Sequence, residues 1–282
     1  MASLTTVERP EGFGETTRTD TWWAGPLATF LGLIAFVIYA NIATFQGTHF
    51  EIRKDPSGNV DWEHGNIVAP YLTPFYSPLL FDARSPHAWF SQAAPSWWPS
   101  WFPFSAALLI LPFPLLFRFT CYYYRKAYYR AFFADPPGCA VGEPKRSYTG
   151  ESRFPFILQN LHRYALYLAI IFILFLWKDA LSAFFFDGKF GVGVGTLVLL
   201  VNVILLSIYT LSCHSLRHLA GGRLDCFSCS NFNKGRHAAW KGFSVINERH
   251  MLFAWLSLFS VGFADFYVRL VSSGAIQDVR LF

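Results

Sequence analysis

The sequence predicts an all-α integral membrane protein, a helix bundle with five transmembrane helices. Of its 282 residues, 53% are hydrophobic, 19% are aromatic and only 15% are charged, which is too apolar for an ordinary soluble domain. The apolar residues also gather in runs of about 20, the length needed to cross roughly 30 Å of hydrocarbon. Because backbone polar groups must find partners within the lipid, these runs are expected to be helices.

The order of the chain gives an expectation for each segment. Residues 1–21 carry acidic side chains and no apolar core, which excludes a cleavable signal peptide and predicts an extramembrane arm. Residues 22–282 are expected to form a single membrane domain, introduced by the interfacial pair Trp22 and Trp23. Prolines should divide the long loop 46–103 into turns and short pieces, and Pro112 and Pro114 should kink the second span. The five spans are expected at residues 26–45, 104–124, 157–186, 192–218 and 243–271.

Basic residues set the expected orientation of these spans. Six lie between Arg125 and Arg153 and six between Arg217 and Arg249, whereas loop 46–103 holds only three. By the positive-inside rule the first two segments face the cytoplasm, which makes the loop external and the N-terminal arm cytoplasmic. The dispersed charges indicate orientation in a membrane and predict no nucleic-acid partner.

Cysteine and histidine residues are the main chemical signal. The predicted topology places six of them near the cytoplasmic ends of four helices: Cys121, His162, Cys213, His214, His218 and His250. Counted from the outer ends of the spans at about 1.5 Å per residue, Cys121, His162, Cys213 and His250 reach similar depths. Four packed helices can direct side chains at such depths toward one locus.

Three kinds of cofactor site are compatible with these residues. Two cysteines and two histidines form the ligand set of a Rieske-type 2Fe-2S cluster, whose potential approaches that of a quinone. Cys226 and Cys229, spaced as C-x-x-C, form a rival zinc or iron–sulfur site with His214 and His218. Any two of the four candidate histidines also suit a b-type haem. The simplest alternative is that each histidine ends a helix and each cysteine is a small core residue.

Several other residues carry expectations of their own. The segment from Tyr122 to Arg130 is compatible with interfacial anchoring, with binding of a partner or of lipid headgroups, or with an aromatic quinone pocket. Arg118, inside an apolar run, is expected to face a cavity or a partner. Asp265 and Arg269, four residues apart, are expected to pair. The five cysteines form an odd set on the cytoplasmic side, so no structural disulfide is expected.

Four motifs carry a resemblance to a known family: Cys121-Tyr-Tyr-Tyr-Arg-Lys-Ala-Tyr-Tyr-Arg130, Asn160-Leu-His162, Ser212-Cys-His-Ser-Leu-Arg-His218 and Asn247-Glu-Arg-His250. With these motifs and all five spans, the chain resembles the single cytochrome b-like but haem-free membrane-anchor subunit of actinobacterial succinate dehydrogenase, respiratory complex II. The resemblance implies a multi-pass protein of the bacterial plasma membrane that anchors a flavoprotein and an iron–sulfur subunit. It also implies electron transfer from succinate to menaquinone through a membrane-embedded Rieske-type cluster.

The same resemblance narrows the candidate site residues. The matching motifs do not include the C-x-x-C pair, so one metal ligand is expected from each of four helices, with His214 and His218 as rivals. The expected ligands are Cys121, His162, Cys213 and His250. Quinone contacts are expected at Tyr123, Arg125 and Arg163.

The functional alternatives differ in class. The chain has no Gly-rich dinucleotide fingerprint, so it is expected to act only as a non-flavin subunit of succinate:quinone oxidoreductase, in a complex that can associate further. One alternative is a quinone-reactive anchor that binds b-type haem. Another is a transporter or a non-redox scaffold, and the lack of paired, discontinuous repeats speaks against it.

Overall fold

The computed structural model describes residues 12–54, 66–85, 87–144, 150–154, 156–186 and 188–282. The first half of the predicted N-terminal arm and residues 55–65 of loop 46–103 lie outside the described residues. The chain forms two compact units: unit 1 comprises Met1–Ile38 and Phe119–Asn160, and unit 2 comprises Tyr39–Arg118 and Leu161–Phe282.

Four helices in the described part of the chain are long and apolar enough to cross a membrane. They are α1 (Ala24–Gln46), α5 (His162–Ser182) with the 3-10 turn η4 (Phe156–Leu161) before it, α6 (Val194–Leu211) and α9 (His250–Ser272). They overlap four of the five predicted spans. The protein is therefore mostly helical, with little sheet, as an integral membrane protein of this composition should be.

The second predicted span, residues 104–124, is divided into shorter helices. α2 (Ala106–Ile110) and α3 (Pro112–Thr120) are separated by Leu111, and Cys121 separates α3 from α4 (Tyr122–Tyr128). Pro112 starts α3 because proline has no N–H group to continue the preceding helix, so the span is interrupted where the prolines lie. Cys121 has extended backbone angles (φ −66°, ψ 129°), so the helical hydrogen bonds cannot run through it. The π-helical turn η2 (Tyr129–Phe133) follows α4.

Three of the predicted span boundaries are wrong, and two of these errors share one cause. The predicted span 192–218 joins α6 to a separate helix, α7 (His214–Gly221), across an extended Cys213. The predicted span 243–271 joins the end of α8 (Asn231–Asn247) to α9. Both predictions joined two separate helices across a short break. At the second break the polar residues Asn247, Glu248 and Arg249 separate α8 from the apolar run of α9. The third span, predicted to reach residue 186, ends at Ser182, and a short hairpin follows it.

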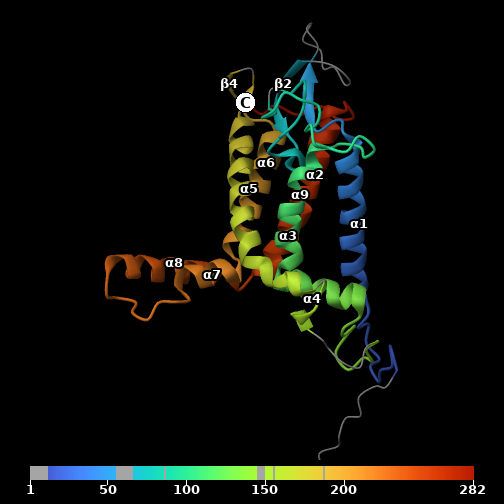
Figure 1. Ribbon diagram of the computed structural model, residues 1–282, viewed down its shortest axis with the longest axis vertical. Helices are drawn as coiled ribbons and strands as arrows, with labels where there is room; N and C mark the ends of the chain where they lie inside the picture. Colours follow the sequence, from blue (N-terminus) through green and yellow to red (C-terminus); the bar gives the residue numbers. More distant parts are fainter. Residues whose placement is uncertain (1–11, 55–65, 86, 145–149, 155, 187) are drawn as a thin grey trace, which may run out of the picture. The chain divides into compact units, whose positions relative to one another are not determined.

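Helices α5, α6 and α9 run side by side in unit 2 (Figure 1). Their core is built from small and β-branched residues, including Ala180, Val203, Ala264 and Val268. Polar contacts join the helices at two levels: Trp177 Nε1 donates to Ser207 Oγ (2.9 Å) between α5 and α6, and Ser260 donates to Asn202 (3.2 Å) between α6 and α9. Such hydrogen bonds stabilise helix pairs where no water competes.

One end of the unit 2 bundle is covered by short strands. β1 (Glu51–Lys54) pairs antiparallel with β2 (Asn66–Leu72), and η1 (Pro74–Tyr76) follows. A second hairpin, β3 (Phe185–Phe186) with β4 (Lys189–Phe190), connects α5 to α6. The described part of loop 46–103 thus consists of short pieces, as its prolines predicted.

The predicted pairing of Asp265 with Arg269 is confirmed at the same end. Arg269 Nε donates to Asp265 Oδ2 at 2.7 Å, and the two side chains are 7% and 0% exposed. Arg269 also donates to the carbonyl oxygens of Ala43 and Thr48, at 2.8 and 2.9 Å. Tyr39 donates to the same carboxylate at 2.6 Å, so the ion pair ties the end of α1 to α9.

Unit 1 combines the start of α1 with α4 and the loop that follows it. The described part of the N-terminal arm packs against this loop through the backbone pair Gly14 N to Gly142 O and Gly142 N to Glu15 O. Arg18 adds a hydrogen bond to the carbonyl oxygen of Cys139. The short turn η3 (Gly150–Ser152) precedes η4.

Candidate metal and quinone site

Three of the four predicted metal ligands lie at one end of unit 2, where α5 and α9 begin and α6 ends. His162 is the first residue of α5, His250 is the first residue of α9, and Cys213 is the N-cap of α7. His162 Nε2 lies 3.2 Å from Cys213 Sγ, and Ser212, the neighbour of Cys213, contacts His250. Cys213 is 1% exposed and His250 is 2% exposed, whereas His162 is half-buried. We refer to these three residues as the cysteine–histidine cluster.

Aromatic packing fixes the planes of both imidazole rings. His162 stacks on Phe117, with ring centroids 4.8 Å apart and planes 7° from parallel. Phe117 contacts Tyr209 edge-on at 5.4 Å, and Tyr209 stacks on His250 at 5.1 Å and 19°. The two histidines therefore lie at opposite ends of a continuous row of four rings, and neither can rotate without displacing its neighbour.

Arg118 lies beside this row, in the last turn of α3. Its guanidinium group donates to the carbonyl oxygen of Ala254 (3.2 Å) and to Ser257 Oγ (3.1 Å) on α9. Its Cζ atom lies 4.8 Å from the centroid of the Tyr209 ring, in a cation–π geometry. This confirms that the intramembrane charge faces a protein partner, as its cost in lipid predicted.

The fourth predicted ligand, Cys121, belongs to unit 1 and resembles Cys213 in its local geometry. Each is a buried thiol outside any disulfide, 1% exposed, and each is the N-cap of a helix. The backbone angles are φ −66°, ψ 129° for Cys121 and φ −62°, ψ 133° for Cys213. Within the described residues, no group of three or more histidine, cysteine, aspartate or glutamate side chains is assembled in metal-binding geometry.

The rival ligand set is arranged differently. Cys226 and Cys229 form a disulfide, so the expectation of no structural disulfide was wrong. That expectation rested on compartment and on the odd number of cysteines, whereas the three-residue spacing brings the two Cα atoms to 5.8 Å, within disulfide range. His214 and His218 lie exposed on α7, and His218 Nδ1 is 3.4 Å from Arg163. In the disulfide form, the rival site lacks its two thiolates.

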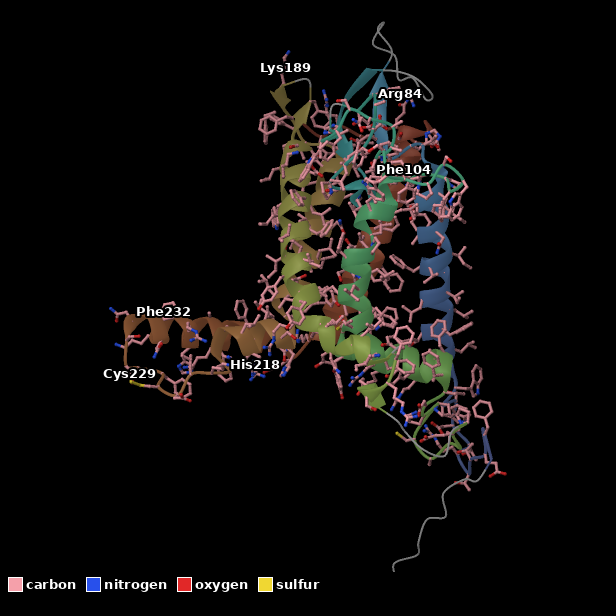
Figure 2. The ribbon with its side chains drawn as sticks, viewed as in Figure 1. Arg84, Phe104, Lys189, His218, Cys229 and Phe232 are labelled. Atoms are coloured by element: carbon pink, nitrogen blue, oxygen red, sulfur yellow. A yellow bond between two sulfur atoms is a disulfide. The ribbon has the colours of Figure 1, made fainter. Side chains whose placement is uncertain are left out.

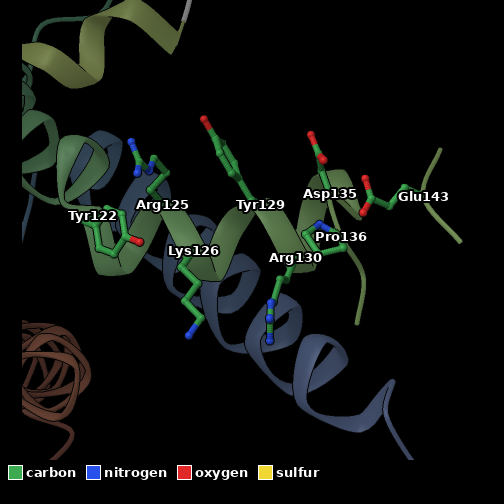
Figure 3. A pocket seen from close by; sticks show the side chains of 8 residues that line it. All are labelled: Tyr122, Arg125, Lys126, Tyr129, Arg130, Asp135, Pro136 and Glu143. Atoms are coloured by element: carbon green, nitrogen blue, oxygen red, sulfur yellow. The ribbon is translucent and has the colours of Figure 1, made fainter. Parts of the chain in front are cut away.

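A separate cavity of about 400 Å³ lies along α4 in unit 1 (Figure 3). Figure 3 shows Arg125 and Tyr129 projecting from one side of the helix and Lys126 and Arg130 from the other. The described lining residues are mostly basic and aromatic, with two carboxylates: Tyr122, Arg125, Lys126, Tyr129, Arg130, Asp135, Pro136 and Glu143. Such a cavity can accept a ring that carries polar oxygens.

Hydrogen bonds hold the Arg125 side of this cavity in place. Arg125 pairs with Glu151 at 2.7 Å and donates to Gln159 at 3.2 Å. Gln159 in turn donates to the hydroxyl groups of Tyr128 (2.5 Å) and Tyr129 (3.3 Å). Burial raises the pKa of both tyrosines, so their hydroxyl groups remain protonated.

The three predicted quinone contacts do not lie together. Arg125 lines the cavity, Tyr123 packs edge-on against Tyr122 with centroids 5.8 Å apart, and Arg163 lies exposed on α5 in unit 2. Sequence reasoning missed Gln159 and Glu151, which position Arg125. It also missed the residues that support the histidines: Phe117, Tyr209 and Ser212.

A family model described as actinobacterial succinate dehydrogenase subunit SdhC matches residues 24–274. The chain belongs to this family. No curated protein sequence matches it. A solved structure, described as the Mycobacterium smegmatis Sdh1 complex in the apo form, contains a chain that is 46% identical, with a TM-score of 0.82. The alignment covers 99% of this chain and 98% of that one.

Membership of the SdhC family confirms the resemblance seen in the sequence motifs. The chain is the membrane subunit of succinate dehydrogenase and assembles with the flavoprotein and iron–sulfur subunits of that enzyme. With its long apolar helices, it is a multi-pass protein of the bacterial plasma membrane.

Proposed function

We propose that this SdhC chain passes electrons from the iron–sulfur subunit to menaquinone through a membrane-embedded Rieske-type 2Fe-2S cluster. Two cysteines, Cys121 and Cys213, and two histidines, His162 and His250, would hold it. When bound, such a cluster supplies one-electron transfer at a potential suited to a quinone. The observation that carries the proposal is the contact of His162 with Cys213. Ser212, the residue before Cys213, also contacts His250.

The protein groups around these side chains suit a buried anionic group. The two cysteines are helix N-caps and His250 begins α9, so these three lie at helix N-termini, where the positive end of the dipole favours negative charge. The ring row keeps both imidazoles in fixed planes. Burial of Cys213 and His250 excludes water from their side of the site.

We also propose that α2 and α3 together make the fifth crossing and that the N-terminus is cytoplasmic. The charge asymmetry supports this orientation, with six basic residues in each of two loops against three in loop 46–103. The same asymmetry puts the cysteine–histidine cluster near the cytoplasmic ends of the spans. That location suits electron entry from a cytoplasmic iron–sulfur subunit.

For the quinone we propose the α4 cavity, with Arg125 as the polar contact. The Arg125 guanidinium is oriented by Glu151 and Gln159, which leaves its remaining N–H groups able to bind a quinone oxygen. Full reduction of menaquinone takes two electrons, supplied from succinate through the partner subunits, and two protons from the cytoplasm.

The test uses the whole purified complex with Cys213→Ala, His162→Ala or His250→Ala. Each should lose about two iron and two acid-labile sulfide per complex relative to wild type, together with a Rieske-type EPR signal. Cys139→Ala, a free exposed cysteine, is the matched control and should retain both. His214→Ala and His218→Ala should also retain them.

Two outcomes would contradict the proposal. One is an unchanged iron and sulfide content in all three ligand variants. The other is an intense Soret band of bis-histidine type in the wild-type complex, which would favour a haem-binding anchor.

A further inference from the structure

The connection between α6 and α9 is a folded helical hairpin formed by α7 and α8. Arg217 stacks on Trp240 (4.8 Å) and donates to Ser244 (2.8 Å), which joins the two helices. Arg236 on α8 donates a 2.8 Å hydrogen bond to the carbonyl oxygen of Ala220 on α7. Asn247 donates to the carbonyl oxygen of Ser212 at 2.6 Å, so the base of the hairpin is fixed to the end of α6.

This hairpin lies where two membrane-crossing helices end. α6 ends at Leu211 and α9 begins at His250, so both points of attachment are at one boundary of the bundle. Figure 1 shows α7 and α8 running across the direction of α5, α6 and α9. The 17 residues of α8 extend for about 25 Å. The helix therefore stays near the depth of the membrane boundary over its whole length.

The two edges of α8 differ in chemistry. At about 100° per residue, positions seven apart lie on the same edge of a helix. Phe232, Ala239 and Ile246 share one edge, and Lys234 and Lys241 share the opposite one. Phe232 is 74% exposed. Figure 2 shows it on the side of α8 toward which α5 and α6 extend, with Cys229 and His218 on the other side.

We propose that α8 is an interfacial helix whose Phe232–Ala239–Ile246 edge inserts among the lipid headgroups of the membrane that α5, α6 and α9 cross. An apolar edge next to the hydrocarbon and a lysine edge toward water are the signature of helices that lie in the interface. The hairpin segment 214–247 contains five lysine and arginine residues and a single acidic one, Asp225, so an anionic lipid surface attracts it. No carboxylate of the described chain pairs with Lys234 or Lys241.

Adjacent alanines provide the test. Ala238 and Ala239 are both exposed and differ by about 100° around the helix. Each is replaced by cysteine in a Cys139→Ser background, labelled with bimane, and measured in the whole complex in nanodiscs of phosphatidylglycerol or phosphatidylcholine. The Ala239→Cys label should be quenched several-fold more by doxyl lipids than the Ala238→Cys label. Aqueous iodide should give the reverse order.

The other outcomes overturn the proposal. Equal iodide quenching at both positions would mean that the hairpin projects into water. Shielding of both labels from both quenchers would mean that a partner subunit covers α8.

A charge variant tests the role of the anionic surface separately. In phosphatidylglycerol nanodiscs, Lys234→Gln with Lys241→Gln should raise iodide quenching at Ala239→Cys, since each lysine strengthens local binding about fivefold. Lys189→Gln, an exposed lysine at the opposite end of the unit 2 bundle, is the matched control and should change nothing. No response in the double variant would remove the electrostatic part of the proposal.

Discussion

Ser212 Oγ lies 2.6 Å from His250 Nδ1, and the same hydroxyl group donates to the carbonyl oxygen of Tyr209 at 2.9 Å. Because the Ser212 hydroxyl proton is donated to the Tyr209 carbonyl oxygen, the Ser212 oxygen must accept the hydrogen bond from an N–H at Nδ1 of His250. This fixes the tautomer and leaves Nε2 with its lone pair. A histidine prepared in this way is suited to bind a metal through Nε2.

Removing this hydrogen bond should weaken the proposed cluster site. Supporting hydrogen bonds to metal-binding histidines are typically worth about 10- to 100-fold in metal affinity. We therefore expect Ser212→Ala complexes to lose iron to a chelator at concentrations about 10- to 100-fold lower than wild type. Ser215→Ala, one turn further along the chain on α7, is the control. Equal iron retention in the two variants would show that Ser212 does not support His250.

The candidate ligands could be read from the sequence, but the groups that support them could not. Cysteine and histidine within apolar runs are rare and therefore visible, and counting residues placed four of them at similar depth. Phe117, Tyr209 and Ser212 are ordinary in such runs. Their roles depend on which helix faces they occupy, and helix rotation is set by packing.

The helix breaks were hidden for a related reason. Cys213 and Cys121 interrupt their helices through backbone angles alone, without proline or glycine at the break. Apolar residues lie on both sides of the break, at Leu211 and Leu216, so the hydropathy pattern predicted one span where the structure has α6 and α7. Pro112, by contrast, marks the break between α2 and α3, because the missing N–H is a property of the residue itself.

The buried Asp265–Arg269 pair should be far more important to stability than the pair on α5 formed by the exposed Lys178 with Asp179. Arg269→Met leaves the Asp265 carboxylate without its cation in a site where both groups are nearly inaccessible to water. We expect a loss of about 3–5 kcal/mol. Lys178 pairs with Asp179 at 3.8 Å but is 66% exposed, so Lys178→Met should cost under about 1 kcal/mol. Thermal unfolding of the purified complex in detergent gives the ranking, and similar effects of the two changes would contradict it.

Two glycines in the α7–α8 hairpin should respond in opposite directions to alanine. A Cβ atom at Gly221 would lie 2.7 Å from atoms of Trp240, so the indole ring must move, at a cost of about 1–3 kcal/mol. A Cβ atom at Gly235 would meet nothing within 4 Å, and alanine there should stabilise α8 by up to about 1 kcal/mol. Limited trypsin cleavage at Arg223 should be faster in Gly221→Ala and no faster in Gly235→Ala. The reverse order would mean that Trp240 does not pack on α7.

Arg118 should raise the reduction potential of the proposed cluster. Its guanidinium group lies 4.8 Å from the Tyr209 ring, which stacks on His250 at 5.1 Å, so a fixed positive charge is close to one of the proposed ligands. A positive charge about 10 Å away stabilises the reduced, more negative form. At an effective dielectric constant of about 20 this amounts to several tens of millivolts.

Arg118→Gln should therefore lower the midpoint potential by that amount in an EPR-monitored redox titration of the complex. Arg118→Lys keeps the charge and should stay close to wild type, although it lacks the second nitrogen with which the guanidinium group contacts α9. The pair of variants separates charge from packing, because a purely structural role for Arg118 would shift both potentials alike. An unchanged potential in Arg118→Gln would contradict the assignment of His250 as a ligand on this side of the site.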